Sequence, residues 1–311
     1  MSFIQCENVV KRYDDLISVD HLSLSINKYE IFGLLGPNGA GKSTAIKMIC
    51  GLLKADQGQI FVGGVSVKTN SIEVKKSLGL VPQEIAIYEN LSARENVKFF
   101  GKLYGLRGEE LNSKVDLALE FVGLTERKNE KPIKFSGGMK RRLNIACAIV
   151  HQPKLIIMDE PTVGIDPQSR NHILESVRKL NEMGSTIIYT SHYMEEIESI
   201  CTKVGIIDSG RLIALGTVEE LIDQNKMEDK ITLIVDFVPN EMVFELEIHP
   251  KIKNVSVNDQ TIQVYLNSSE TYLQDILFIL SKHDVKVHTL KREDPNLESL
   301  FLSLTGRSLR D

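Results

Sequence analysis

The chain has 311 residues and a formal net charge of −5, and its residues are 42% hydrophobic and 25% charged. These proportions are typical of a globular protein, and the length suits one large domain and a smaller one. No apolar run approaches the ~20 residues of a membrane-spanning helix, and the N-terminus has no apolar signal core, so we expect a cytosolic protein. The negative charge argues against general nucleic-acid binding. The four cysteines are far apart in the sequence, which predicts neither disulfides nor a metal site.

Up to about residue 217 the sequence alternates short apolar runs with longer amphipathic ones, which predicts an α/β domain. Between Ser92 and Gly123 the apolar residues recur at helical spacing, which predicts a helical block. We place a first domain at residues 1–218, with a helical subdomain at about 84–149 inside it. The expected strands are residues 31–36, 78–83, 154–160, 185–192 and 203–210.

The pattern changes after this domain. Residues 219–230 are expected to be a linker. Beyond them, three short strands, a helix, another strand and a last helix follow one another. This order predicts a small accessory α+β domain at residues 231–311, large enough to fold around a core of its own.

Residues 36–44, GPNGAGKST, follow the first expected strand and precede a helix-like run. They match GxxxxGK[ST], a pattern in which glycines let backbone amides surround phosphate oxygens at the start of a helix. We expect Lys42 to reach the β- and γ-phosphates of a nucleotide and Ser43 to bind Mg²⁺. A glycine-rich turn without a ligand is the alternative. The predicted phosphate-binding residues are Gly36, Pro37, Asn38, Gly39, Ala40, Gly41, Lys42, Ser43 and Thr44.

Two adjacent acids end the expected strand at residues 154–160. Asp159 comes at the carboxyl end of a buried strand, where α/β sheets bind ligands, and it can hold Mg²⁺ directly or through water. Glu160 can orient or deprotonate the water that attacks a phosphate. Acids after a strand are common in loops, so the pair indicates this chemistry only together with the phosphate-binding loop.

Further motifs identify a family. Residues 135–143, FSGGMKRRL, resemble the signature sequence of ABC (ATP-binding cassette) ATPases, and residues 163–166, VGID, resemble the D-loop of the same family. Gln83 matches the Q-loop glutamine, and His192 matches the switch histidine. Tyr13 stands where the family places an aromatic ring against adenine. Together with the phosphate-binding loop and the two acids, these ordered motifs carry the resemblance.

The resemblance implies a P-loop NTPase fold of the ABC nucleotide-binding type, with ATP and Mg²⁺ as cofactors. It also implies a homodimer, because in the family two cassettes meet head to tail and each signature closes the ATP pocket of the other subunit. Phe135 and Met139 replace the more usual leucine and glutamine of the signature. Arg141 and Arg142 are interpreted as a solvated helix face and are not assigned to the site. The residues that the resemblance adds are Tyr13, Gln83, Ser136, Gly137, Gly138 and Asp166 for the nucleotide, Glu160 and His192 for catalysis, and Ser43, Gln83 and Asp159 for the metal.

Within this superfamily, the single cassette and the absence of a long coiled coil favour a transporter subunit. A separate multi-span permease would then dock on the helical subdomain. Residues 296–311 resemble the tail of ATP-binding subunits from bacterial antibiotic and multidrug exporters of the daunorubicin-resistance type. This resemblance implies a peripheral protein at the cytoplasmic face of a bacterial membrane. It also implies export of a hydrophobic antibiotic, such as a polyketide, and thus resistance.

Several alternatives stay open. Related subunits export lipids, sodium or polysaccharides. A soluble ATP-driven clamp that acts on a macromolecule is a rival from another class, and a small-molecule kinase is a more distant one. The accessory domain has two readings, either an appendage that stabilises the homodimer or an element that regulates or contacts the permease.

Overall fold

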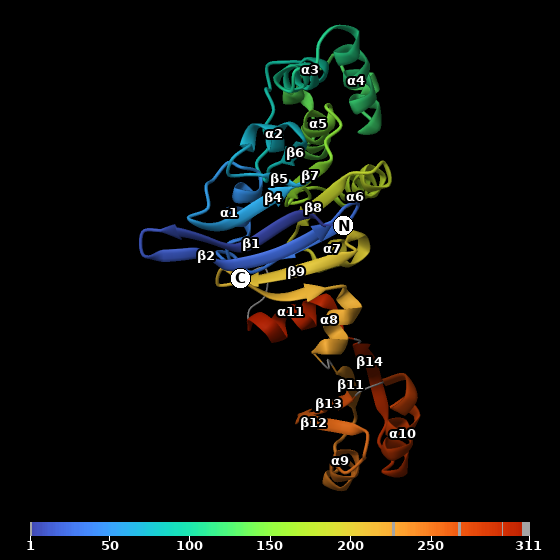
Figure 1. The fold of residues 1–311 in the computed structure, drawn as a ribbon. Coiled ribbons are helices and arrows are strands. Elements are labelled where there is room, and N and C mark those ends of the chain that lie inside the picture. Colours follow the sequence, from blue (N-terminus) through green and yellow to red (C-terminus); the bar gives the residue numbers. More distant parts are fainter. Residues whose placement is uncertain (1, 226–227, 267–268, 294, 307–311) are drawn as a thin grey trace. The chain divides into compact units, whose positions relative to one another are not determined.

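The computed structural model describes residues 2–225, 228–266, 269–293 and 295–306. The chain divides into two compact units, Met1–Thr217 and Val218–Gly306. Each unit has a hydrophobic core of its own. Figure 1 shows the elements of both units with their labels.

The first unit contains two sheets. The larger has the order β10-β9-β3-β8-β7-β6, in which five neighbouring strands are parallel and β10 runs antiparallel to β9. The smaller has the order β2-β1-β4-β5 and is antiparallel. The strands are β1 Ser2–Tyr13, β2 Leu16–Asn27, β3 Ile31–Leu35, β4 Gln57–Val62, β5 Val65–Ser66, β6 Leu78–Val81, β7 Leu155–Asp159, β8 Thr186–Thr190, β9 Lys203–Asp208 and β10 Arg211–Gly216.

The parallel strands are the apolar runs that the sequence singles out. All residues of β3 and β8 are buried, as expected for central strands covered on both faces. The strands end earlier than expected, because their last predicted residues already form the loops that carry the motifs. The antiparallel sheet was not predicted, since register shifts interrupt the alternation of β1 between its partners β2 and β4.

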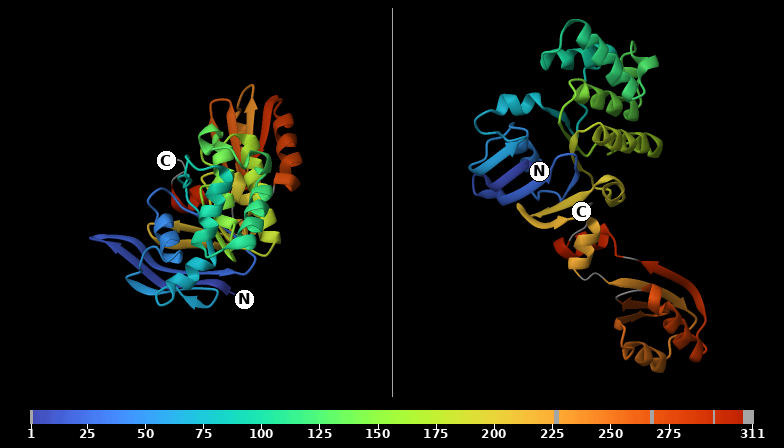
Figure 2. Two further views of the ribbon diagram at one scale, coloured as in Figure 1. Left: turned by 90° about the horizontal axis from the view of Figure 1, so that it is seen from above. Right: turned by 45° about the vertical axis from the view of Figure 1, so that its right-hand side comes forward.

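Helices α3, α4 and α5 form the helical block of the first unit. Figures 1 and 2 show α3 and α4 together at one end of this unit, with α5 leading from them to the larger sheet. Helix α3 begins at a capping box, in which Ser92 and Glu95 satisfy each other's backbone amides. The helices of the unit are α1 Lys42–Ile49, α2 Ser71–Lys76, α3 Ala93–Leu103, α4 Gly108–Phe121, α5 Gly137–Ile149, α6 Pro167–Glu182 and α7 Met194–Ile200, with 3₁₀ turns η1 Thr125–Arg127 and η2 Pro132–Lys134.

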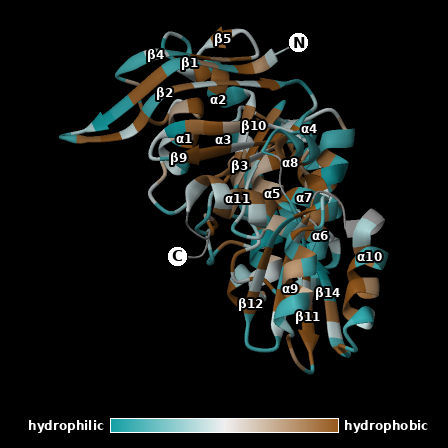
Figure 3. Cartoon of the chain, turned by 90° about the horizontal axis from the view of Figure 1, so that it is seen from below, coloured by the Kyte–Doolittle hydropathy of each residue, from teal (hydrophilic) through white to brown (hydrophobic). Residues whose placement is uncertain are grey.

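The second unit has an antiparallel sheet in the order β12-β13-β11-β14. Figure 3 colours β11 as largely hydrophobic, in agreement with the apolar core of this unit. Helix α9 was not predicted, because its 8 residues are too few to show a clear helical repeat of apolar positions. The elements are α8 Val218–Gln224, β11 Asp229–Val235, α9 Asn240–Glu247, β12 Ile252–Asn258, β13 Thr261–Leu266, α10 Ser269–Lys282, β14 Val287–Glu293 and α11 Leu297–Thr305.

The segment expected to be a linker, residues 219–230, is ordered for much of its length. Helix α8 occupies its first part, because Leu221 is buried and α8 contacts α11, and β11 begins at Asp229. Residues 226–227 of this segment and residues 307–311 of the expected accessory domain lie outside the described residues. In the part of the chain that the structure describes, no helix combines the length and apolar character needed to cross a membrane.

Candidate functional site

The phosphate-binding loop connects β3 to α1 and requires glycine at two positions. Gly41, at the start of α1, has φ 103°, and a Cβ on it would lie 2.3 Å from the carbonyl oxygen of Ser18. A Cβ on Gly36 would lie 2.3 Å from the carbonyl oxygen of Ile207. Any other residue would displace backbone at either point. The glycines therefore fit the loop tightly against neighbouring strands.

Lys42 is the buried cation of this loop, with 8% of its surface exposed. Its Nζ donates to the carbonyl oxygens of Gly36 at 2.5 Å and Pro37 at 3.1 Å. Burial lowers the pKa of Lys42, while the charges of Glu160 and Asp159 raise it. A buried ammonium beside a helix start and two carboxylates suits the binding of a phosphate with its metal ion.

Both predicted acids lie at the end of β7, where the neighbouring parallel strand β8 contacts them. Asp159 ends β7 and pairs in register with Thr190, the last residue of β8. The Thr190 hydroxyl donates to Asp159 Oδ1 at 2.7 Å and accepts from the backbone N–H of Glu160 at 2.9 Å. Thr190 thus orients both acids. This role of Thr190 was not predicted, because the local sequence around residues 154–160 does not reveal the pairing of β7 with β8.

Glu160 lies at the centre of the site, with 7% of its surface exposed and a backbone φ of 48°. Its Oε1 lies 2.6 Å from His192 Nε2. Its Oε2 accepts a hydrogen bond of 2.9 Å from Gln83 Nε2, across 77 residues of sequence. The structure therefore brings together three predicted residues from three different loops, and both carboxylate oxygens have a fixed direction.

Tyr13 ends β1 and is 45% exposed. The turn that follows pairs it with Leu16. Two residues further on, the Ser18 hydroxyl lies 2.9 Å from that of Thr44, and the Ser18 carbonyl borders Gly41. The hairpin that carries Tyr13 thus adjoins the phosphate-binding loop, as a ring that stacks on adenine requires. Like Thr190, Ser18 is a residue of the site that was not predicted from the sequence.

The signature residues form a second group. Ser136 caps α5 by accepting the backbone N–H of Met139 at 3.2 Å. Gly138 packs on α6, where a Cβ would lie 2.1 Å from Ser169 Oγ. Asp166 caps α6 by accepting the backbone N–H of Ser169 at 2.9 Å, a bond that lowers the pKa of Asp166. The signature and the D-loop therefore lie side by side.

The two groups are separate within one chain. Among the described residues, no hydrogen bond or ion pair joins Ser136, Gly137, Gly138 or Asp166 to the group around Glu160. Ser136 and Gly137 are exposed at the start of α5, where helix amides suit an anion. This arrangement fits a signature that faces another molecule.

The interpretation of Arg141 and Arg142 as a solvated helix face is wrong. Arg141 is only 3% exposed, and Arg142 is half-buried. Helix α5 packs against α3, α4, α6 and β6, so most of its sides face protein. Both guanidiniums donate to backbone carbonyls.

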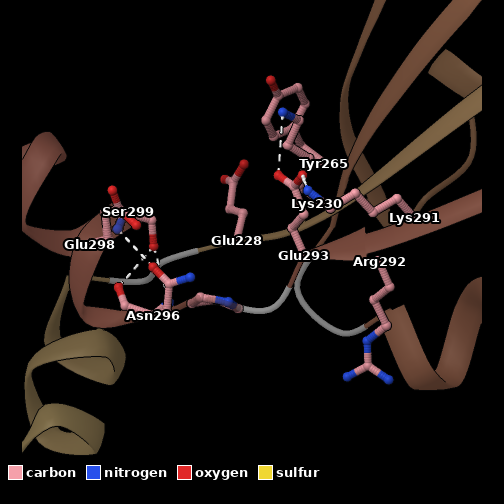
Figure 4. Close-up of a pocket in the computed structure, with 10 residues that line it drawn as sticks. Glu228, Lys230, Tyr265, Lys291, Arg292, Glu293, Asn296, Glu298 and Ser299 are labelled. Carbon is pink, nitrogen blue, oxygen red and sulfur yellow. Dashed lines mark hydrogen bonds and ion pairs between the residues drawn. The ribbon is translucent and has the colours of Figure 1, made fainter. Parts of the chain in front are cut away.

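A pocket of about 890 Å³ lies elsewhere, in the second unit. Figure 4 shows its charged lining, to which none of the predicted site residues belongs. Lys230 and Lys291 both pair with Glu293, at 3.5 and 2.7 Å. These charges offset one another, so we assign no ligand to this pocket.

The first unit has the geometry of a P-loop ATPase, with a glycine loop, a buried lysine and two consecutive acids at the carboxyl end of a parallel strand. Residues 19–163 match the ABC transporter family. The chain is 47% identical over 310 residues to the linearmycin resistance ATP-binding protein LnrL of Bacillus subtilis (strain 168), covering 99% of this chain and 100% of that protein. It is 37% identical over 308 residues to the Nod factor export ATP-binding protein I of Sinorhizobium fredii (strain NBRC 101917 / NGR234), covering 99% and 87%.

A solved structure shares the fold. The chain matches cbiO1 from Clostridium perfringens, described as part of the ABC transporter complex cbiONQ, with a TM-score of 0.66 and 25% identity over 80% of this chain and 96% of that one. The chain belongs to the ATP-binding subunits of ABC transporters, which hydrolyse ATP to energise transport. The predictions of fold class, family and ATPase activity are confirmed.

Proposed function

We propose that this subunit energises the export of a hydrophobic antibiotic or drug through a separate membrane permease and thereby confers resistance. The observation that carries the proposal is the 47% identity to a linearmycin resistance protein over 99% of this chain. That similarity extends through the C-terminal unit, outside residues 19–163 of the ATPase match. Export of another amphiphile is the second candidate, favoured by the 37% identity to a Nod factor export protein.

The residues present fit MgATP. Asp159 offers a carboxylate at the end of β7, and Ser43 has an exposed hydroxyl in the first turn of α1. Gln83 uses its amide nitrogen to hold Glu160, so its amide oxygen is the atom left for a cation. These three oxygen groups are ligands that Mg²⁺ accepts. We assign the metal to them and the phosphates to residues 36–44, with Tyr13 against the adenine.

Glu160 is the proposed catalytic base. Its two oxygens are held by His192 and Gln83, so the carboxylate is already oriented before it polarises a water. His192 is also proposed to support the γ-phosphate, and Lys42 to bind the β- and γ-phosphates. Mg²⁺, when bound, neutralises charge on the phosphates. The geometry thus supplies a held base beside an anion site.

A homodimer completes the proposed site. The signature residues Ser136, Gly137 and Gly138, with Asp166 beside them, would contact the nucleotide bound by the opposite subunit. The absence of direct polar contacts between this group and Glu160 among the described residues supports the assignment, and Ser136 and Gly137 are exposed at the start of α5, where a ligand of another molecule can reach them.

Docking of the permease at the edge of the helical subdomain is supported by a pocket of about 360 Å³, which the end of α3 lines together with the end of α1, α2 and β6 outside that subdomain. Three apolar side chains at this pocket are strongly exposed, namely Leu52 at 58%, Ile72 at 72% and Leu103 at 67%. Exposed apolar side chains around a hollow suit a short amphipathic helix. We propose that a cytoplasmic helix of the permease occupies it, which would place this chain at the cytoplasmic face of a bacterial membrane.

We propose an ATP-binding domain at residues 1–218 and an accessory domain at 231–311, a division supported by the two compact units Met1–Thr217 and Val218–Gly306. The accessory domain is proposed to stabilise the homodimer. No nucleic acid is expected as a partner.

The proposal is tested in the host cell. Deletion of this subunit should lower the antibiotic concentration that stops growth, for one or more hydrophobic antibiotics including linearmycin. The intact chain should restore resistance and Glu160→Gln should not. A tagged chain should also co-purify from detergent-solubilised membranes with a multi-span protein. Unchanged drug sensitivity together with ATPase activity stimulated by DNA or RNA would favour the soluble clamp instead.

A further inference from the structure

Arg141 lies on the second turn of α5, just after the signature. Its guanidinium donates through Nη1 to the carbonyl oxygen of Pro82 at 2.6 Å and through Nη2 to that of Gln83 at 2.5 Å. A side chain of the signature helix therefore holds the backbone of the loop that follows β6.

This contact is costly to build. A guanidinium loses its hydration when it is buried, and burial lowers the pKa of Arg141. In the described parts of the chain, no carboxylate forms an ion pair with it, and its Nε has no hydrogen-bond partner. Among the residues that the structure describes, the hydrogen-bond acceptors that offset this cost are the carbonyl oxygens of Pro82 and Gln83. Such a residue is better explained by a geometry that it enforces than by a gain in stability.

The loop that Arg141 holds carries the side chain that reaches Glu160. Gln83 accepts from Arg141 with its backbone carbonyl and donates from its side-chain Nε2 to Glu160 Oε2 at 2.9 Å. The bond from Gln83 to Glu160 depends on the bond from Arg141 to Gln83, because the position of the Gln83 side chain is set by the backbone that Arg141 holds. We propose that Arg141 is a positioning residue that fixes the Q-loop backbone. The side chain of Gln83 is thereby placed so that its amide nitrogen holds Glu160 and its amide oxygen can bind the metal.

This inference rests on the proposed roles of Gln83 and Glu160. It adds a physical connection between the signature residues at the start of α5 and the group around Glu160. Ser136 and Gly137 lie one turn before Arg141 on α5, so a nucleotide that the signature engages on the opposite subunit acts on the same helix that holds Gln83. Engagement of one ATP is thereby linked to the orientation of the base at the other.

The neighbouring arginine provides a matched control. Arg142 also donates to two backbone carbonyls, those of Val122 at 2.8 Å and Gly123 at 3.3 Å. These residues follow α4, inside the helical block and away from the Gln83 loop. Replacing either arginine by lysine keeps the positive charge but removes the planar guanidinium, which reaches its two acceptors through two nitrogens in Arg141 and through Nη1 alone in Arg142. A merely structural role would make the two replacements equivalent.

The experiment uses the purified full-length chain and measures ATPase rate against ATP and against Mg²⁺. Arg141→Lys should lower kcat about 10-fold and raise the Mg²⁺ concentration for half-maximal rate, as loss of a supporting contact around a metal site does. Binding of a fluorescent ATP analogue should change less than about twofold. Arg142→Lys should leave kcat and the Mg²⁺ dependence within about twofold. Equal effects of the two variants on the Mg²⁺ dependence would overturn the proposal.

A double-mutant cycle tests whether the bonds act in series. Gln83→Ala should lower kcat at least as much as Arg141→Lys, and the double variant should lose nothing beyond Gln83→Ala. Independent losses that multiply in the double variant would refute the proposal. If Arg141→Lys does not fold, as judged by thermal unfolding, the same cycle is run with Arg141→Gln, which keeps a neutral donor.

Glu160→Gln is measured in the same series to separate this inference from the function on which it rests. A fully active Glu160→Gln would remove the assignment of the base and this inference with it. An inactive Glu160→Gln combined with multiplying losses in the cycle would leave the proposed function intact and overturn only the role of Arg141.

Discussion

The two units of the chain differ in where they keep polar side chains. The buried polar and charged residues of the described chain all lie in the first unit, and they are Lys42, Asn96, Arg141, Asn144, Glu160, Thr162, Ser176, Thr186, Thr190, Ser191 and Glu196. In the second unit the buried side chains are apolar, and charged groups such as Glu245 and Lys282 pair near the surface.

The difference indicates that ATP hydrolysis constrains the core of the first unit and not that of the second. A buried polar group that lacks a partner costs about 1–3 kcal/mol, so a fold without chemistry to perform has little reason to bury many of them. Part of this set, including Glu160, Thr190 and Ser191, lies at the ends of β7 and β8. Polar substitutions there should change activity as well as stability, whereas those in the second unit should change little.

Glu160→Gln should give the largest effect. The variant keeps the shape of the side chain but removes the base, so kcat should fall by about 10²–10⁴-fold while ATP binding persists. Size-exclusion chromatography of this variant should show a monomer that becomes a dimer when ATP is added. Binding of ATP without any dimer would mean that Phe135 and Met139 weaken the signature or that the permease must hold the two cassettes together.

Glu196→Ala should give the next largest effect. Glu196 is 3% exposed, and its Oε2 accepts from the hydroxyls of Thr162, Tyr189 and Ser191 at 2.7–2.9 Å. Arg170 forms an ion pair with its other oxygen at 3.3 Å. Removal of the carboxylate leaves these partners without this acceptor, so the free energy of unfolding should fall by about 3–5 kcal/mol. Urea unfolding at neutral pH measures it.

The matched variant in the second unit is Glu245→Ala. Glu245 also accepts from two partners, Lys282 at 2.8 Å and His283 at 2.8 Å, but in contact with solvent. Water replaces these bonds, so the unfolding midpoint should not move measurably. Equal destabilisation by the two variants would contradict the contrast between the units. ATPase activity provides a second readout. Glu196 accepts a hydrogen bond from Ser191, which directly precedes His192, so Glu196→Gln should slow ATP hydrolysis even where the variant folds.

His151 should make the first unit sensitive to acid. Its ring stacks on Tyr104 at 3.5 Å between centroids, and burial lowers the pKa of His151 to about 4. An unfolded chain takes up this proton at about pH 6.5, before the folded chain does, so unfolding binds protons and stability decreases as pH falls from about 6.5 toward 4. The loss should approach about 3 kcal/mol at pH 4.

The measurement is urea unfolding at pH 7 and at intervals down to pH 4, for the intact chain and for His151→Phe. Phenylalanine keeps the stack on Tyr104 but does not titrate, so the difference between the two chains isolates this group. The variant should lose less stability on acidification. Parallel pH profiles would show that His151 takes up no more protons unfolded than folded.

The sequence alone reached the parts of the molecule that local patterns encode. The apolar runs predicted β3, β6, β7, β8 and β9, and the motif residues that the structure gathers around Glu160 were all predicted. Contacts between segments distant in sequence were not predictable, because they depend on which strands adjoin. Thr190 acts through its pairing with Asp159, and Arg141 acts through a loop 58 residues away. Bulges in β1 and the shortness of α9 hid further elements.

The smallest expected effect compares two threonines at strand positions, one in each unit. The Thr190 hydroxyl serves Asp159 and the backbone of Glu160, whereas the Oγ1 of Thr232 on β11 is buried without a hydrogen-bond partner among the described residues. Thr190→Val should lower the free energy of unfolding by about 1–3 kcal/mol and slow ATP hydrolysis, and Thr190→Ser should restore both.

Thr232→Val removes a hydroxyl that gains nothing from the fold, so it should leave ATPase activity unchanged and stabilise the chain by up to about 1 kcal/mol. Urea unfolding and ATPase rates of Thr190→Val and Thr232→Val, measured side by side, test whether the two hydroxyls contribute differently to stability and activity. Because the change of side chain is the same in both, opposite signs would follow only from what each hydroxyl contacts. A destabilised Thr232→Val would mean that the second unit also depends on buried polar contacts, and the contrast between the units would fail.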